Sequence, residues 1–469
     1  MNSAFIWILF PVIVAGVLLI IIRWRTLSSI VAAVAALILA ALAAWLPAQE
    51  QIVIWRWVIP FSESFLFFGR QLELTAADRP TLVVLYFTVA LWFVGVPLAR
   101  PTRLFLPLGM AIVALFAAAI AVEPFLFAAV LILIAVLLSI PLVSFPGKAA
   151  GRGVLRYLTF QTLGMPFVLI SGFFFTGFEG GPGDPVIAAI AIALLAIGFA
   201  LLLGVFPFHT WIPMLAEDSH PYPAVFIFLL LPIAVLLFGL GFLDNYVWIR
   251  EDPNTLLLLQ LIGALMVVIA GVWAAVEGNL SRMLGFAVLL DIGYSLLAIS
   301  LAIGTDPVNY RLIFLSGLLP RGISLGILAL AMSSLNRRVS SFGIYDLRGL
   351  GKIFPGTSTS IIIALFCLAG LPLLAGFPFK LGIIEGISSQ APVISIWVIL
   401  GSFGLIIGTI RLLISMVSSE NVSDDRKPES RLLIVFLLVG VGLLFLIGLF
   451  PNIFLQLISK FPGAFTSLG

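Results

Sequence analysis

Long apolar runs repeat along almost the whole chain and decide what it can fold into. A helical run of about 20 apolar residues crosses a hydrocarbon core about 30 Å thick. About fourteen such runs are present, at residues 4–22, 27–46, 81–98, 104–121, 125–145, 155–175, 186–206, 223–243, 256–275, 283–302, 309–332, 358–387, 392–416 and 432–450. Because backbone polar groups in lipid need internal partners, these runs predict an all-α polytopic membrane protein.

The composition excludes a soluble globular domain. Hydrophobic residues make up 62% of the chain and charged residues 10%, whereas soluble domains carry about 25% charge. The single cysteine, Cys367, excludes a disulfide framework. The two histidines, His209 and His220, lie too far apart along the chain to make a good metal site. Neither a phosphate-binding loop nor a nucleophilic triad is evident, so we expect no catalytic site in the chain itself.

The basic residues predict the orientation of the helices. The first run ends at Arg23 and Arg25 without a cleavage site, which indicates a retained helix. If the N-terminus lies outside, most lysines and arginines fall in inward connections, as the positive-inside rule requires. The basic isoelectric point, about 9.1, therefore reflects topology and not nucleic-acid binding.

The segment Ala369–Lys380 interrupts an apolar run with glycines, prolines and a lysine. An ammonium at the bilayer centre costs at least about 2.5–3.5 kcal/mol, and such groups mark ion or proton paths. Broken backbone at that depth survives only inside protein or beside a wet cavity. A buried amine can also load and release a proton near neutral pH. These facts favour Lys380 as a charge carrier over a side chain that snorkels to the interface.

A short internal repeat links this segment to an earlier one. Phe206–His209 and Phe377–Lys380 share Phe-Pro-Phe and place a titratable group at the fourth position. Paired Gly/Pro-interrupted spans are typical of transporters built from two repeated bundles. We therefore expect broken helices near 206–213 and 370–380.

Few ionisable residues fall inside the apolar runs, and these make up the candidate ion path. Asp291 needs a partner if it is ionised, and Arg321 is the nearest basic residue by helix order. The pair is either a packing element or a relay that protonation breaks. Glu385 lies about 140° around the helix from Lys380, so the two do not share a face. His209, next to a helix break, either titrates or serves as a structural hydrogen-bonder, and Arg411 near a helix end is expected to snorkel.

Four collinear elements resemble the antiporter-like membrane subunits of respiratory complex I and their relatives, the Mrp-type sodium/proton antiporters. Phe206–Pro213 is similar to the family's Pro-[Phe/Leu]-His-x-Trp-Leu-Pro signature, and Pro221–Ala224 to the Pro-x-Pro element that follows it. Leu280–Ala287 resembles the Lys-Arg-x-Leu-Ala-Tyr-Ser segment. Ala369–Lys380 matches the Ala-Gly-x-Pro-x-x-x-Gly-Phe-x-x-Lys element. The resemblance extends over residues 80–452.

The resemblance implies fourteen helices, two inverted five-helix repeats and broken seventh and twelfth helices. It divides the chain into N-terminal helices with an outer connection at 47–80 (1–102), a first repeat (103–245), a second repeat (246–417), and an inner connection with the last helix (418–469).

The first repeat departs from the family. Ile132 lies near the position of the family's glutamate, Leu202 near that of a lysine, and Pro232 near that of a second lysine. In the eleventh helix, Pro320, Arg321 and Ser324 replace a histidine and a lysine. An uncharged path cannot relay protons through side chains, so any conduction is expected in the C-terminal half.

The resemblance implies a subunit of a proton- or cation-translocating complex, of the NADH- or ferredoxin:quinone oxidoreductase type or the Mrp type. Its partners would be other membrane subunits, with protons and possibly sodium as its ions and no cofactor of its own. The expected location is a bacterial plasma, thylakoid or other energy-coupling membrane. Whether the chain counts as part of an enzyme stays open. The alternatives are a degenerate structural subunit that conducts nothing and a stand-alone solute transporter.

Overall fold

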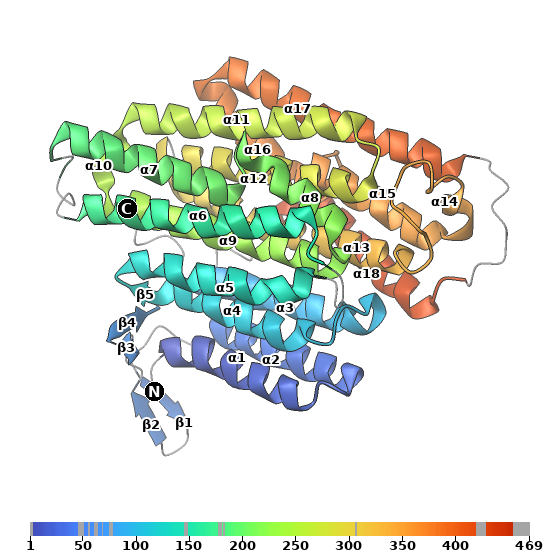
Figure 1. Cartoon of the computed structure of the whole chain (residues 1–469), viewed down its shortest axis with the longest axis horizontal. Coiled ribbons are helices and arrows are strands. Elements are labelled where there is room, and N and C mark those ends of the chain that lie inside the picture. The colour runs from blue at the N-terminus through green and yellow to red at the C-terminus, as the bar shows by residue number, and fades with distance from the viewer. Residues whose placement is uncertain are drawn as a thin grey trace.

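A computed structural model shows a bundle of roughly parallel helices with two small sheets at one end (Figure 1). It describes residues 3–45, 51–54, 57–60, 64–67, 69–74, 78–144, 149–176, 181, 183–304, 307–418 and 428–453. The helices are α1 (Ser3–Ile20), α2 (Arg25–Trp45), α3 (Arg79–Ala99), α4 (Phe105–Ala121), α5 (Ala128–Val143), α6 (Arg152–Phe175), α7 (Pro185–Leu203), α8 (Trp211–Asp218), α9 (Pro221–Asn245), α10 (Val247–Glu251), α11 (Pro253–Val276), α12 (Leu280–Gly304), α13 (Pro307–Leu335), α14 (Leu350–Ile353), α15 (Pro355–Ala369), α16 (Gly376–Gln390), α17 (Pro392–Val417) and α18 (Arg431–Leu449). Short 3₁₀ turns, η2 (Phe125–Phe127) and η3 (Phe208–Thr210), precede α5 and α8.

The predicted class, a mainly helical multi-pass membrane protein, is confirmed. In the described part, 11 helical segments are long and apolar enough to cross a membrane. Shorter apolar helices cover Ile6–Ile20, Phe105–Ala121 and Pro355–Ala369. The number of about fourteen spans stays a prediction.

The connection at 47–80 contains strands that the all-α prediction did not include. Its described residues form β1 (Gln51–Ile54), β2 (Trp57–Pro60), β3 (Ser64–Phe67) and β4 (Arg70–Glu73). β1 pairs with β2, and β4 lies between β3 and β5 (Val122–Glu123), all antiparallel. β-branched and aromatic residues are frequent here, and such side chains favour strands. These strands and α10 lie at the end of the bundle opposite α14 (Figure 1).

Two sets of helices pack in the same pairwise order. In the first set, α4 contacts α5, α5 contacts α6, and α6 contacts both α7 and α8. In the second set, α11 contacts α12, α12 contacts α13, and α13 contacts both α15 and α16. This agreement is what two repeats with one broken helix each would produce. The inverted relation between them stays a prediction.

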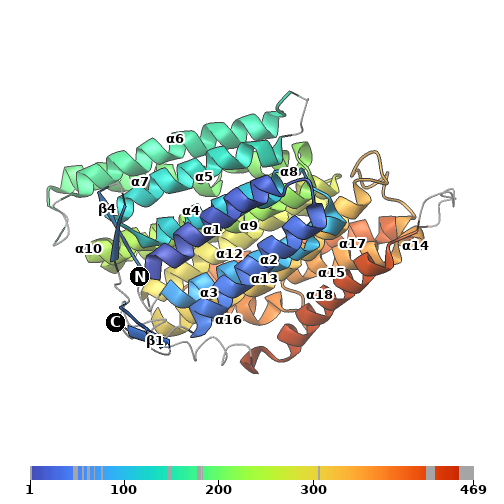
Figure 2. The same ribbon diagram turned by 90° about the horizontal axis from the view of Figure 1, so that it is seen from below.

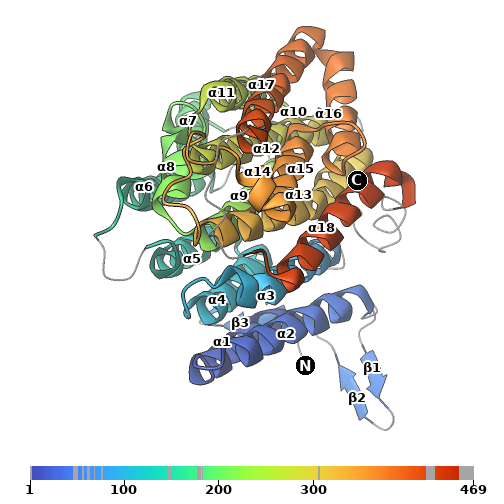
Figure 3. The same ribbon diagram turned by 90° about the vertical axis from the view of Figure 1, so that its right-hand side faces the viewer.

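The middle of the bundle is formed by α12, with α9 and α13 beside it. α12 is the most buried of the candidate spans, and α9 and α13 follow. α6 and α18 lie at opposite edges, and α1 and α2 form one outer layer (Figures 2 and 3). A charged side chain on α12 therefore faces protein and not lipid, and it needs a partner inside the bundle.

Candidate functional site

Both predicted helix breaks are present, and each begins at a glycine. α7 ends at Gly204 (φ +66°), and α8 follows after η3. α15 ends at Gly370 (φ +85°), and α16 starts at Gly376. A left-handed φ favours glycine. At Gly370 a Cβ atom would also lie 3.0 Å from Cδ of Lys380, so glycine leaves room for the lysine to cross the end of α15.

The Phe-Pro-Phe repeat does not place His209 and Lys380 at equivalent steps. His209 lies five residues after Gly204, in η3, whereas Lys380 lies ten residues after Gly370, inside α16. Their surroundings differ as well. His209 is half-buried and stacks on Phe206 with ring centroids 5.7 Å apart, and its Nδ1 atom has no hydrogen-bond partner among the described residues.

Lys380 is buried, with only 7% of its surface exposed. Its Nζ donates a hydrogen bond to the carbonyl of Leu368, in the last turn of α15. The same Nζ lies 4.5 Å from the centre of the Tyr294 ring. A C-terminal helix carbonyl and an aromatic face both stabilise a cation. The break thus provides Lys380 with two neutral partners that suit an ammonium group.

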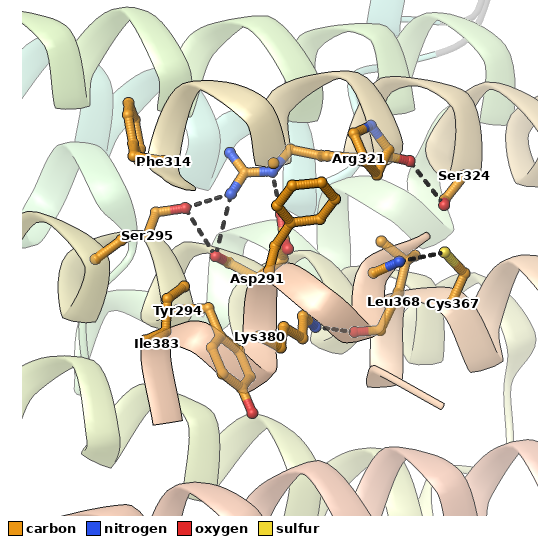
Figure 4. Close-up of a pocket in the computed structure, with 15 residues that line it drawn as sticks. Asp291, Tyr294, Ser295, Phe314, Arg321, Ser324, Cys367, Leu368, Lys380 and Ile383 are labelled. Atoms are coloured by element: carbon orange, nitrogen blue, oxygen red, sulfur yellow. Dashed lines mark hydrogen bonds and ion pairs between the residues drawn. The ribbon is translucent and has the colours of Figure 1, made fainter. Parts of the chain in front are cut away.

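Asp291 and Arg321 form the expected ion pair next to this lysine, as Figure 4 shows. Nε of Arg321 contacts the carboxylate of Asp291, and a terminal guanidinium nitrogen donates to the Asp291 carbonyl at 3.3 Å and to Oγ of Ser295. Ser295 in turn donates to the Asp291 carbonyl at 2.9 Å. The pair joins α12 to α13 and is held by backbone as well as side-chain contacts.

A cavity of about 50 Å³ connects these groups. Its lining includes Asp291, Arg321 and Lys380 together with Tyr294 and Ser295 (Figure 4). A water molecule needs about 10–15 Å³ of such space and two or more polar partners. The cavity therefore has room for a few waters among polar groups. Two cations and one anion face it, so loss of a proton from Lys380 leaves an amine beside a balanced ion pair.

The structure places the other predicted path residues away from this cavity. Glu385 is exposed on α16, and His209 belongs to the other break. Arg411 donates to the carbonyls of Ala275 and Glu277 at the end of α11. Glu385 and His209 thus do not join Lys380, because the first lies on another face of α16 and the second follows a different helix.

Sequence reasoning missed several polar residues around the breaks. Tyr294 contacts Lys380, and its hydroxyl pairs with Ser402 at 2.7 Å. Gln161 on α6 is fully buried and donates to the carbonyl of Leu202 at 2.9 Å. A lone amide within the run 155–175 was the available signal for Gln161. In the part of the chain that the structure describes, no cluster of three potential metal ligands is present.

The helical membrane fold agrees with comparisons to known proteins. Residues 183–408 match the family model described as the transmembrane region of NADH:quinone oxidoreductase and Mrp antiporter subunits. This match spans just under half of the chain. It is 28% identical over 280 residues to "NADH-quinone oxidoreductase subunit N 1" of Herpetosiphon aurantiacus, an alignment that covers 58% of this chain and 55% of the relative. The chain thus spans little more than half the length of that relative.

Two solved structures share the fold. A chain of the membrane-bound sulfane sulfur reductase, an archaeal respiratory membrane complex, superposes with a TM-score of 0.80 at 20% identity, covering 99% of this chain and 98% of that one. A chain of the Mrp complex from Dietzia sp. DQ12-45-1b gives a TM-score of 0.80 at 17% identity, with 98% and 96% covered. At these identities the likeness establishes the fold alone.

Proposed function

We propose that this chain is the antiporter-like subunit of a multi-subunit membrane complex that translocates protons or another cation, and that the ion path runs through its C-terminal half. The observation that carries this proposal is the buried Lys380, which lies at a helix break beside a cavity with polar groups in its lining and beside the Asp291–Arg321 pair. Buried ionisable groups in membrane spans mark ion paths.

The proposed chemistry is proton exchange between Lys380 and water in the cavity. The ammonium rests on the Leu368 carbonyl and the Tyr294 ring, and both partners tolerate a neutral amine after the proton has left. The Asp291–Arg321 pair is neutral overall, and its charge does not change while Lys380 loses its proton. A change in the separation of Lys380 from this pair would alter its proton affinity, which is how a neighbouring subunit could drive transport.

The proposed partners are other membrane subunits, and energy comes from them. In an oxidoreductase, redox subunits would supply this energy. In an Mrp-type assembly, a coupled ion gradient would supply it. This chain would bind no cofactor, and the membrane would be a bacterial plasma, thylakoid or other energy-coupling membrane. Subunits that copurify in mild detergent distinguish the two kinds of host.

The direct test is Lys380→Met, which keeps the side-chain length and removes the charge. We expect at least a tenfold loss of proton uptake by vesicles that contain the assembled complex, measured with a pH-sensitive dye, because general acid–base groups commonly contribute about 10²–10⁴-fold. The matched control is Glu385→Gln, which removes a charge from an exposed position on the same helix. It should leave uptake unchanged.

A non-conducting structural subunit is the second candidate. It is favoured by the first repeat, where α5 and α7 contain no charged residue and Ile132 and Leu202 are buried at positions where the family has charges. This alternative predicts that Lys380→Met assembles and transports as the wild type does.

A further inference from the structure

The N-terminal end of α15, which the distribution of basic residues predicts on the inner side of the membrane, is held by a carboxylate from another part of the chain. Glu429, just before α18, accepts hydrogen bonds from the backbone nitrogens of Gly356 and Thr357 at 3.1 and 2.7 Å. The hydroxyl of Thr357 donates to the same carboxylate. These nitrogens belong to the first turn of α15, where backbone donors lack partners within the helix and a negative charge is stabilising.

A second contact strengthens the same junction. Arg338, which follows α13, donates to the carbonyl of Pro428 at 3.3 Å. Its guanidinium also lies 4.5 Å from the centre of the ring of Phe354, the residue that precedes α15. Burial lowers the pKa of Arg338, and the nearby Glu429 carboxylate opposes that shift. We call Arg338, Phe354, Pro428 and Glu429 the inner latch.

α15 connects the inner latch to Lys380. Its 15 residues span about 22 Å, and the helix contains no proline beyond its first residue and no glycine beyond its second. At the far end, the carbonyl of Leu368 accepts from Lys380 and Sγ of Cys367 accepts from the backbone nitrogen of Gly376 at 3.2 Å. A displacement of the inner end of α15 along its axis therefore moves the carbonyl that holds Lys380.

We infer that Glu429 is a positioning residue for Lys380, acting through α15. The latch also ties α15 to α13, which carries Arg321, so it holds together the two helices whose residues face the lysine across the cavity. The inference that Glu429 positions α15 does not depend on whether the chain transports ions. The effect of Glu429 on transport rests on the proposed function of Lys380.

The single cysteine of the chain provides the test. Cys367 is 1% exposed beside the cavity, which is too small for N-ethylmaleimide, so modification requires the break to open. In membranes that contain the whole complex, Glu429→Ala should raise the rate of Cys367 modification roughly two- to thirtyfold, the range that corresponds to loss of a helix cap. Glu429→Gln keeps the shape of the side chain and one acceptor oxygen, so it should give a smaller rise.

The matched control is Asp184→Ala, which removes the cap of α7, the other broken helix; Asp184 accepts from the backbone nitrogen of Val186 at 2.8 Å. It should leave the modification rate of Cys367 unchanged.

Lys380→Met, like Glu429→Ala, should raise the modification rate of Cys367. The double variant should raise the rate by less than the product of the two single effects. Equal rates in the wild type and both Glu429 variants, or fully multiplicative effects, would overturn the inference. Because the readout is chemical modification, it stands even if Lys380→Met leaves transport intact.

Discussion

α7 and α15 end in the same way, but different side chains complete the two breaks. In each helix, the carbonyl two residues before the terminal glycine accepts a hydrogen bond from a buried side chain. The carbonyl of Leu368 is bound by the ammonium of Lys380 from α16, and that of Leu202 by the amide of Gln161 from α6. An amide satisfies the carbonyl but cannot change its protonation state near neutral pH. The comparison shows that the break is an architectural element and that the donor decides whether it can carry a proton.

The cavities near the two breaks differ in the same sense. The cavity beside Lys380 is small and has charged and polar side chains in its lining. The one between α7, α9, α11 and α12, which includes Val205 at the first break, has about 160 Å³, and only Thr255 among its lining residues has a polar side chain. Apolar cavities of this size stay dry. Water thus has polar partners in the cavity at the second break and almost none in the apolar cavity beside the first.

The largest effect is expected from Asp291→Asn, which tests the charge balance of the second break. It leaves the buried guanidinium of Arg321 without its counter-ion. Removing one partner of a buried ion pair costs about 3–5 kcal/mol, and thermal unfolding of the purified complex measures the loss. The double variant Asp291→Leu with Arg321→Met should recover most of it. A stability change in Asp291→Asn within about 1 kcal/mol would show that water already screens the pair.

The next effect tests the neutral break. Gln161→Leu should lower the stability of the fold by about 1–3 kcal/mol, because the carbonyl of Leu202 loses its donor in a buried site. Proton uptake per assembled complex should stay the same, in contrast to Lys380→Met. A loss of uptake as large as that of Lys380→Met would mean that the first break is also part of the path.

Sequence patterns predict the helical class, both breaks and the Asp291–Arg321 pair. Each of these depends either on local sequence or on a group whose free energy in the membrane is unfavourable without a partner. Long apolar runs, glycines at the ends of those runs and an intramembrane charge that needs a partner leave few alternative structures. The partners of the breaks are harder to predict. Gln161 reaches α7 from α6, and Glu429 reaches α15 from a segment 72 residues beyond Thr357, and no local spacing encodes either contact. The Phe-Pro-Phe repeat wrongly indicated that His209 and Lys380 are equivalent, because the repeated residues follow the two glycines at different distances along the chain.

A pH effect is expected close to the first break, at His220. Its Nδ1 accepts from the backbone nitrogen of Tyr222 at 3.3 Å and caps α9. Burial, and then the charge of Arg337, lower the pKa of His220 to about 4. The unfolded chain binds this proton near pH 6.5, so the stabilisation is present above that value and is lost as the pH falls from about 6.5 to about 4.

The variant His220→Asn measures this contribution, because asparagine caps a helix without titrating in this range. The Tm of the wild type should fall more steeply than that of His220→Asn between pH 6.5 and 4. Parallel profiles would show that His220 does not act as a titrating cap.

The smallest effect is expected from His209→Phe, and it tests the comparison most directly. Phenylalanine keeps the stacking on Phe206 and removes both ring nitrogens of His209, of which Nδ1 has no partner in the described part of the chain. The contact that is lost is a hydrogen bond with the backbone of Pro207. We expect a stability change within about 0.5 kcal/mol and proton uptake within about twofold of the wild type. Uptake by vesicles of the assembled complex, measured beside Lys380→Met, checks this. If both variants lost proton uptake equally, the two breaks would be consecutive parts of one proton path. Gln161 would then serve to position His209, and it would not be the neutral replacement of a lysine.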